Sequence, residues 1–205
     1  VYERNREAAD NENKYVVRCL NTGKICLFTD GGKMHQVKVP DLPYGKFRDK
    51  GTPIDNVSNY SSAEEQIVMV CDAEQMRFAK LLFATKQGMI KRVEGTEFQV
   101  AKRTIAATKL QEEDVLIGVW VVNEIQHAVL QTKNGYFLRF PAADIPEKKK
   151  GAVGVRGIRL QKNDELEQVY LFEEGTESKV MYGEKEVTLN RLKLAKRDGT
   201  GTKSR

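Results

Sequence analysis

The sequence predicts an all-β protein, a single domain built from a repeated four-stranded unit. Three segments share one pattern: an apolar strand and a Thr are followed by a short turn with Gly and by a second strand that carries cations. These segments are Ile25–Val39, Leu81–Val93 and Ala128–Phe140. Their turn glycines, Gly32, Gly88 and Gly135, recur roughly every 50 residues, a period typical of an array of supersecondary units.

Each copy continues into a second half, in which a short strand, a polar turn and an apolar strand follow a basic linker. The expected strand pairs are Gly51–Val57 with Ile67–Val70, Thr104–Leu110 with Val115–Val122, and Gly157–Leu160 with Leu166–Phe172. This predicts four strands per unit. Because so small a unit cannot close a hydrophobic core alone, we expect the units to stack on their neighbours as blades.

Turn and helix signals agree with this class. Asn134 followed by Gly135 predicts a type I′ hairpin turn, in which both residues have positive φ. The best helical candidates are short, at Tyr2–Asn13 and Ala63–Gln66. The predicted domain spans residues 1–205, with approximate repeat boundaries 1–21 (the end of a first blade), 22–78, 79–126, 127–172, and 173–205 (a partial blade and a basic tail).

Composition limits the functional class. Of 205 residues, 40% are hydrophobic and 31% charged, and no apolar run approaches the roughly 20 residues that span a bilayer, so we expect no membrane partner. The polar start, Val1–Lys14, does not resemble a signal peptide. Cys19, Cys26 and Cys71 lack metal or disulfide spacing and are expected to be buried, reduced thiols of a cytoplasmic protein.

No catalytic or metal site is predicted. His35 and His127 have no neighbouring ligands at metal spacing and are interpreted as surface or strand residues. The glycine-rich segment Gly151–Gly157 follows a basic run and leads into a strand, whereas a phosphate-binding loop follows a strand and opens a helix. We therefore expect no enzyme activity from this chain by itself.

The net charge of +5 is modest, but cations recur at equivalent positions of the repeats. They fall on the second hairpin strand and in the linker after it, which predicts a discontinuous basic rim that can follow a curved polyanion and contact its phosphates. For any single cation, an ordinary solvated surface is the competing interpretation. The candidate DNA-binding residues are Lys33, Lys38, Lys46, Arg48, Lys50, Lys91, Arg92, Lys102, Arg103, Arg139, Lys148, Lys149, Lys150, Arg156, Arg159, Arg191, Lys196 and Arg197.

The repeat has the form TxxGxxxR, linker, GxRGIxL, turn, Asp, strand. With this pattern, and with Lys150–Leu160 and Tyr44–Val57 in particular, the chain resembles the C-terminal domain of the A subunit of bacterial type II topoisomerases, gyrase and topoisomerase IV. The resemblance covers nearly the whole chain. It implies a β-pinwheel, a propeller-like disc of four-stranded blades that exchange strands, here incomplete or open.

The resemblance also implies partners and a place of action. The basic rim of such a domain binds and bends duplex DNA, and its protein partners are the rest of the A subunit, together with the ATPase subunit. ATP and magnesium belong to other parts of the parent enzyme, so no cofactor is expected for this domain. The expected location is the bacterial cytoplasm, in association with the nucleoid.

One departure favours topoisomerase IV over gyrase. Gyrase A subunits carry a QRRGGKG box that lets the pinwheel wrap DNA, and the corresponding position here is Glu3–Ala9, with Arg4, Asn5 and Arg6 as the degenerate remnant. The glycines are missing, so we expect bending that supports relaxation and decatenation rather than strong wrapping. A gyrase wrapping domain and a propeller-like scaffold for protein interactions are the alternatives. The basic tail Lys203–Arg205 is expected to be disordered.

Overall fold

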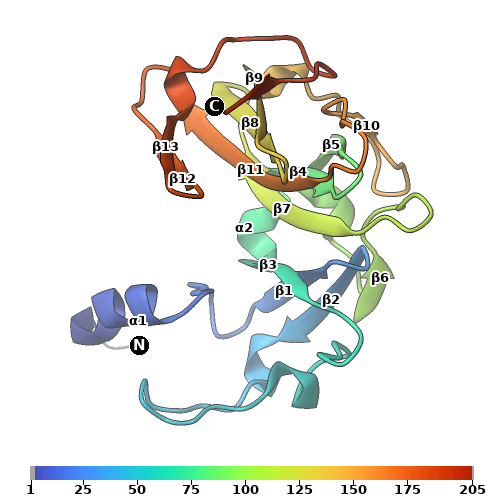
Figure 1. The fold of residues 1–205 in the computed structure, drawn as a ribbon. Coiled ribbons are helices and arrows are strands. Elements are labelled where there is room, and N and C mark those ends of the chain that lie inside the picture. Colours follow the sequence, from blue (N-terminus) through green and yellow to red (C-terminus); the bar gives the residue numbers. More distant parts are fainter. Residues whose placement is uncertain (1–2, 205) are drawn as a thin grey trace.

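A computed structural model describes residues 3–204 and confirms the all-β class. Three antiparallel four-stranded sheets follow one another around an arc, and a two-stranded sheet lies beyond the third (Figure 1). No helix of the described chain is both long and apolar enough to cross a membrane.

The sheets define the blades. Blade 1 contains β3 (Ile67–Asp72), β1 (Lys24–Thr29), β2 (Lys33–Lys38) and β6 (Thr104–Ala106), in that order. Blade 2 contains β10 (Val155–Arg156), β5 (Met89–Glu94), β4 (Lys80–Thr85) and β7 (Leu116–Val122). Blade 3 contains β11 (Leu166–Glu173), β8 (Gln126–Thr132), β9 (Tyr136–Pro141) and β14 (Thr202–Lys203), and the last sheet pairs β12 (Lys179–Tyr182) with β13 (Lys185–Thr188).

Each complete blade takes one strand from the repeat that follows it. β6 belongs to the second repeat but pairs with β2, β10 of the third repeat pairs with β5, and β14 of the fourth pairs with β9. The expected four-stranded blades with strand exchange are therefore confirmed, and the second repeat supplies four strands, β4 to β7, of which β6 completes the preceding blade. The expected tail at residue 203 is corrected, because Lys203 pairs with Tyr136 in β14; Arg205 lies outside the described residues.

Two expected strands differ from the structure. The strand predicted at Gly157–Leu160 is instead β10, just before it. Arg156 pairs with Met89, the first residue of β5, and the next amide, that of Gly157, already donates to the Gly88 carbonyl of the hairpin turn, so the ladder ends there. The segment predicted as a strand at 51–57 contains the 3-10 turn η3 (Ile54–Asn56). An exchanged strand needs the hairpin of a preceding blade, and residues 3–204 contain no blade before blade 1.

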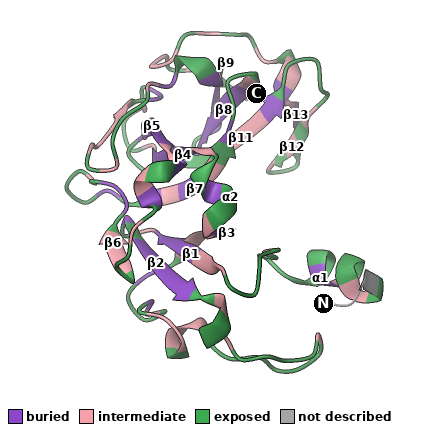
Figure 2. Cartoon of the chain, turned by 180° about the vertical axis from the view of Figure 1, so that it is seen from behind, coloured by how far each residue is buried: buried purple, intermediate pink, exposed green. Residues whose placement is uncertain are grey.

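The hydrophobic cores lie between blades, because the hairpin strands are buried on both faces (Figure 2). Leu81 and Phe83 of β4 face the core shared with blade 1, where Phe28 packs edge-on to Phe83. Leu82 and Ala84 of the same strand belong to the core shared with blade 3. This alternation follows from the two-residue period of a strand, and it means that no blade buries its apolar residues without its neighbour.

The three hairpins share one turn. The Gly32, Gly88 and Gly135 amides each donate to the carbonyl of the Thr three residues earlier, and all three glycines have positive φ. Asn134 is not among the residues with positive φ, so the predicted type I′ turn is wrong. With three residues between the strands, a type I turn that ends in a left-handed Gly is the hairpin that fits.

Helices are few and short. The predicted helix near the start is η1 (Glu3–Asn5) followed by α1 (Arg6–Glu12), which stands away from the sheets (Figures 1 and 2); Tyr2 lies outside the described residues. The candidate at 63–66 is only a turn, since the Gln66 amide donates to the Asp30 carboxylate and directs the chain into β3. The sequence did not predict α2 (Ala73–Arg77), which begins at the capping residue Asp72.

Candidate nucleic-acid interface

The second strand of every hairpin leads through a 3-10 turn into a linker to the next blade. These turns are η2 (Val39–Asp41), η4 (Gly95–Phe98), η5 (Ala142–Asp144) and η6 (Leu189–Arg191). Because the turns start at the same end of equivalent hairpins, the linkers recur at equivalent positions along the arc. The exposed candidate cations that they carry, here called the linker cations, are Lys46, Arg48, Lys50, Lys102, Arg103, Lys148, Lys149, Arg191 and Lys196; Lys193 on the last linker is exposed as well.

The other exposed candidates lie beside this set. Lys33 and Lys38 are exposed at the two ends of β2, and the Lys33 ammonium lies 3.8 Å from the Glu65 carboxylate. Arg159 is exposed just after β10. These residues are accessible to a polyanion, but they belong to strands and turns rather than to the linkers.

The structure removes Arg92 and Arg139 from the expected interface. Both guanidinium groups are buried and turned toward the linker of the next repeat: Arg92 Nε donates to the Ile145 carbonyl at 2.6 Å, and Arg139 Nη1 donates to the Asn190 carbonyl at 2.6 Å. Gln36 occupies the same position in blade 1, four residues after the turn Gly, and its amide donates to the Lys102 carbonyl at 2.6 Å. At this position of all three blades, here called the clamp, the side chain therefore donates to backbone carbonyls of the next repeat.

Lys91 is likewise buried, with 1% of its surface exposed. Its ammonium donates to the carbonyls of Lys149, Lys150 and Ala152. Lys150 is half-buried, and its ammonium donates to the Glu97 carbonyl at 3.2 Å. Neither side chain is presented to a ligand in this arrangement, in contrast to Lys148 and Lys149.

Arg156 and Arg197 take part in contacts between repeats. The Arg156 guanidinium pairs with Asp198, and this hydrogen bond lowers the pKa of the Asp198 carboxyl below its usual range. Arg197 is half-buried and donates to the Arg156 carbonyl at 2.7 Å. The cations of β10 and of the last linker are therefore partly engaged in holding the fourth repeat against the third.

The segment expected to correspond to the gyrase box, Glu3–Ala9, is helical. Arg4 and Arg6 are exposed and Asn5 is half-buried, in η1 and at the start of α1. No Gly occurs from Glu3 to Ala9, and helical backbone cannot approach a phosphate as closely as a glycine loop can.

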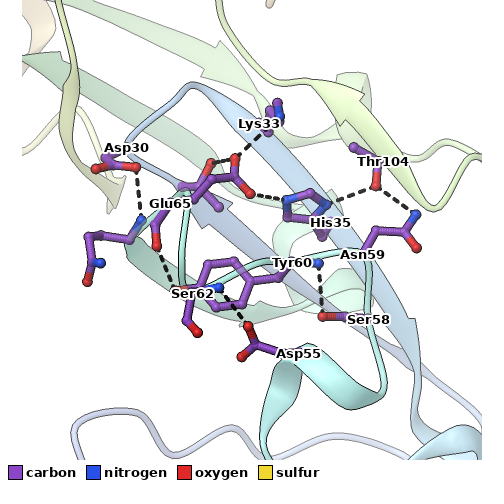
Figure 3. Close-up of polar contacts among 12 residues, drawn as sticks. Asp30, Lys33, His35, Asp55, Ser58, Asn59, Tyr60, Ser62, Glu65 and Thr104 are labelled. Atoms are coloured by element: carbon purple, nitrogen blue, oxygen red, sulfur yellow. Dashed lines mark hydrogen bonds and ion pairs between the residues drawn. The ribbon is translucent and has the colours of Figure 1, made fainter.

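A buried polar cluster in blade 1 was not predicted from the sequence (Figure 3). His35 Nε2 lies 2.8 Å from Glu65 Oε2, and His35 Nδ1 lies 2.9 Å from Thr104 Oγ1 on the exchanged strand β6. Burial, the largest single influence, would raise the pKa of the Glu65 carboxyl. The hydrogen bonds from His35 and Thr29, together with the charges of His35 and Lys33, nevertheless hold this pKa below its usual range. Thr104 Oγ1 also accepts a hydrogen bond from Asn59, so the cluster fastens β6 to its blade.

The repeat offers a signal for this cluster. In the other blades the equivalent of Glu65 is Asp114 or Asp164. One carboxylate oxygen of each Asp accepts a backbone amide of the hairpin turn, from Gln87 or Asn134, and also the amide of the residue that follows the Asp. The longer Glu side chain reaches past the turn to His35. A Glu in place of Asp, with a His on the facing strand, was the available clue.

Comparison with known proteins agrees with this architecture. Residues 79–123 and 126–173 match the family described as the DNA gyrase C-terminal domain, beta-propeller. The chain is 33% identical over 203 residues to the DNA gyrase A subunit of Lawsonia intracellularis, and 34% identical over 143 residues to that of Deinococcus deserti. It spans 24% and 18% of the lengths of these relatives.

Solved structures share the fold. The C-terminal domain of DNA topoisomerase IV superposes with a TM-score of 0.84 at 22% identity, covering 98% of this chain and 67% of that one. The C-terminal domain of DNA gyrase A superposes with a TM-score of 0.66 at 21% identity, covering 91% of this chain and 61% of that one. The fold is thus the β-pinwheel of strand-exchanged blades. The residues that the family model matches, 79–123 and 126–173, belong to the family of DNA gyrase C-terminal domains, and the chain is similar to DNA gyrase A subunits over nearly its whole length.

Proposed function

We propose that this domain binds duplex DNA without reading its sequence and bends the duplex along the linker cations. The observation that carries the proposal is the recurrence of exposed cations on four successive linkers of one curved array. Lysines and arginines that contact phosphates release condensed counterions, which gives affinity independent of base sequence. Smoothly bending about 20 to 30 base pairs by about 40 to 90° costs on the order of 1 to 6 kcal/mol, so several linkers must contribute together.

In the parent enzyme the domain would act as an accessory module. It would hold one duplex beside the catalytic part of the A subunit, which works with an ATPase subunit, and so bias the geometry in which two duplexes cross. In this proposal the domain performs no cleavage and binds no cofactor, while ATP and magnesium act elsewhere in the enzyme, in the bacterial cytoplasm. The glycine-free helix at Glu3–Ala9 favours the topoisomerase IV type, which relaxes and decatenates DNA.

The gyrase type is the second candidate, because the two relatives described above carry the gyrase name. In that case the domain would wrap DNA around the rim rather than bend it locally. The two candidates share the same phosphate contacts and differ in how far the duplex follows the arc.

Binding to two unrelated duplexes of equal length, about 30 base pairs each, tests the shared proposal. We expect equal affinity for both duplexes within about twofold and a steep loss of affinity between about 50 and 200 mM salt. Energy transfer between dyes at the two ends of the duplex should increase on binding if the duplex bends. Affinity that depends on sequence, or that is insensitive to salt, would contradict the proposal.

A further inference from the structure

Lys91 holds the backbone of the loop that carries the densest basic run. Its ammonium donates to the carbonyls of Lys149 at 3.1 Å, Lys150 at 3.0 Å and Ala152 at 2.6 Å. An ammonium has three donors and no acceptor, so these three bonds satisfy it completely. A buried ammonium without such partners would be strongly unfavourable.

The contact is specific to blade 2. Three residues after the turn Gly, where blade 2 has Lys91, blade 1 has His35 and blade 3 has Leu138. His35 is bound to Glu65 and Thr104, and Leu138 lies in the core shared with blade 2. The blade fold therefore tolerates an apolar residue here, and the ammonium is not a requirement of the hairpin itself.

The loop at 148–152, here called the basic loop, is held from several sides. The Lys148 amide donates to the Arg92 carbonyl, and the Ala152 amide closes a turn onto the Lys149 carbonyl. The Glu97 carboxylate of η4 accepts the Lys150 amide at 3.2 Å. The Lys91 ammonium binds the carbonyls at both ends of the turn from Lys149 to Ala152, and no other ammonium of the described residues does so.

We propose that Lys91 is a positioning residue of the DNA interface: by binding three carbonyls of the basic loop, it fixes Lys148 and Lys149 in the arrangement that meets phosphate. This inference rests on the proposed function. Lys91 does not contact the duplex. Its effect is to order the loop before DNA arrives, so that binding does not have to order it.

The surroundings of the Lys91 ammonium allow it to stay charged, and so to keep its three hydrogen bonds, at neutral pH. The centroid of the Phe83 ring of β4 lies 5.4 Å from it, the Glu97 carboxylate acts on it electrostatically, and its bonds to Lys149 and Lys150 are to their backbone carbonyls. Burial lowers the pKa of Lys91 to about 8, partly opposed by Glu97, so the ammonium form predominates below that pH.

The test uses the Lys91→Leu variant, which copies the Leu138 of blade 3, with Lys133→Leu on an exposed hairpin turn as the matched control. Trypsin cleaves after lysine, so the rate at which it cuts the basic loop in the absence of DNA measures how mobile the loop is. We expect cleavage within 148–150 to be about tenfold faster in Lys91→Leu than in wild type, as expected for a loop that has lost its anchoring bonds. Lys133→Leu should leave that rate unchanged.

The DNA readout separates positioning from direct contact. We expect Lys91→Leu to lower duplex affinity about tenfold, the ordering cost being added to binding, with the dependence of log affinity on log salt unchanged. A slope that falls by about 0.9 would mean that Lys91 itself neutralises a phosphate and would overturn the proposal. Unchanged protease sensitivity or unchanged affinity would overturn it too.

Folding is monitored by amide exchange of β4, which should remain protected in Lys91→Leu. If that variant does not fold, Lys91→Met, which keeps an unbranched apolar side chain and removes the ammonium, takes its place. It should accelerate cleavage and lower affinity at constant slope, and the absence of both effects would refute the positioning role. If the wild-type protein fails to bind duplex DNA, the proposed function fails, while the protease result still shows whether Lys91 orders the loop.

Discussion

Neutralising Lys148 and Lys149 together should reduce both the affinity for duplex DNA and its salt dependence. Both side chains are exposed on the basic loop, whereas the third lysine of the run, Lys150, donates to the Glu97 carbonyl. Each phosphate contact contributes about 0.9 to the slope of log affinity against log salt, so the Lys148→Gln, Lys149→Gln variant should lose about 1.8 units. Extrapolated from a 1 M reference, this corresponds to roughly a 60-fold loss of affinity at 0.1 M salt.

Fluorescence anisotropy of a labelled duplex across a salt titration measures both quantities. Lys150→Gln is the informative comparison, because the slope of log affinity against log salt should fall by less than about 0.9, the value for one phosphate contact. Lys185→Gln, in the exposed part of β13 and outside the linkers, should leave the slope unchanged. If the double variant keeps the wild-type slope, the run is an ordinary solvated surface and the linker cations are not the phosphate contacts.

Three further outcomes concern the clamps, the polar cluster and the N-terminal helix. Arg139→Leu leaves the carbonyls that it binds without their donor and should lower the free energy of unfolding by about 2 kcal/mol, and an unchanged urea midpoint would contradict the clamp. Glu65→Gln should lower the free energy of unfolding by about 2 kcal/mol at neutral pH. The pKa of Glu65 in the folded protein lies below its unfolded value of 4.5, so the stability from the ionised carboxylate is present above pH 4.5 and is lost as the pH falls through the folded pKa. The free energies of unfolding of wild type and variant should therefore converge in acid. When nicked circular DNA is ligated in the presence of the native domain, the linking number should change only slightly. The change should be larger when QRRGGKG replaces Glu3–Ala9 in a protein that extends upstream. A large change with the native domain, comparable with that of a gyrase domain, would reject the topoisomerase IV type.

The hairpins could be predicted from the sequence because their information is local. A Thr three residues before a Gly, between two apolar strands, defines each turn. The exchanged strands could not be placed in the same way, since Thr104 pairs with His35 across 69 positions and β10 is only two residues long. A strand of two residues has no hydrophobic period to detect.

The site was predictable to the level of linkers but not of individual cations. Arg92 and Lys102 both look like basic residues of one repeat, yet Arg92 is buried because carbonyls of the following repeat surround it. That environment is created by another part of the chain. Gln36 was the available hint, because an amide at a position otherwise held by Arg suits a carbonyl better than a phosphate.

Strand exchange also sets the order in which this chain can be assembled on the ribosome. Blade 1 remains three-stranded until residues 104–106 have been synthesised, and blade 3 waits for residues 202–203. At a translation rate of roughly 5 to 20 residues per second, each blade spends seconds with an unpaired strand edge, the kind of surface that templates aggregation. The nascent domain therefore grows with one open edge that moves along the chain, and every new repeat closes the edge left by the one before it.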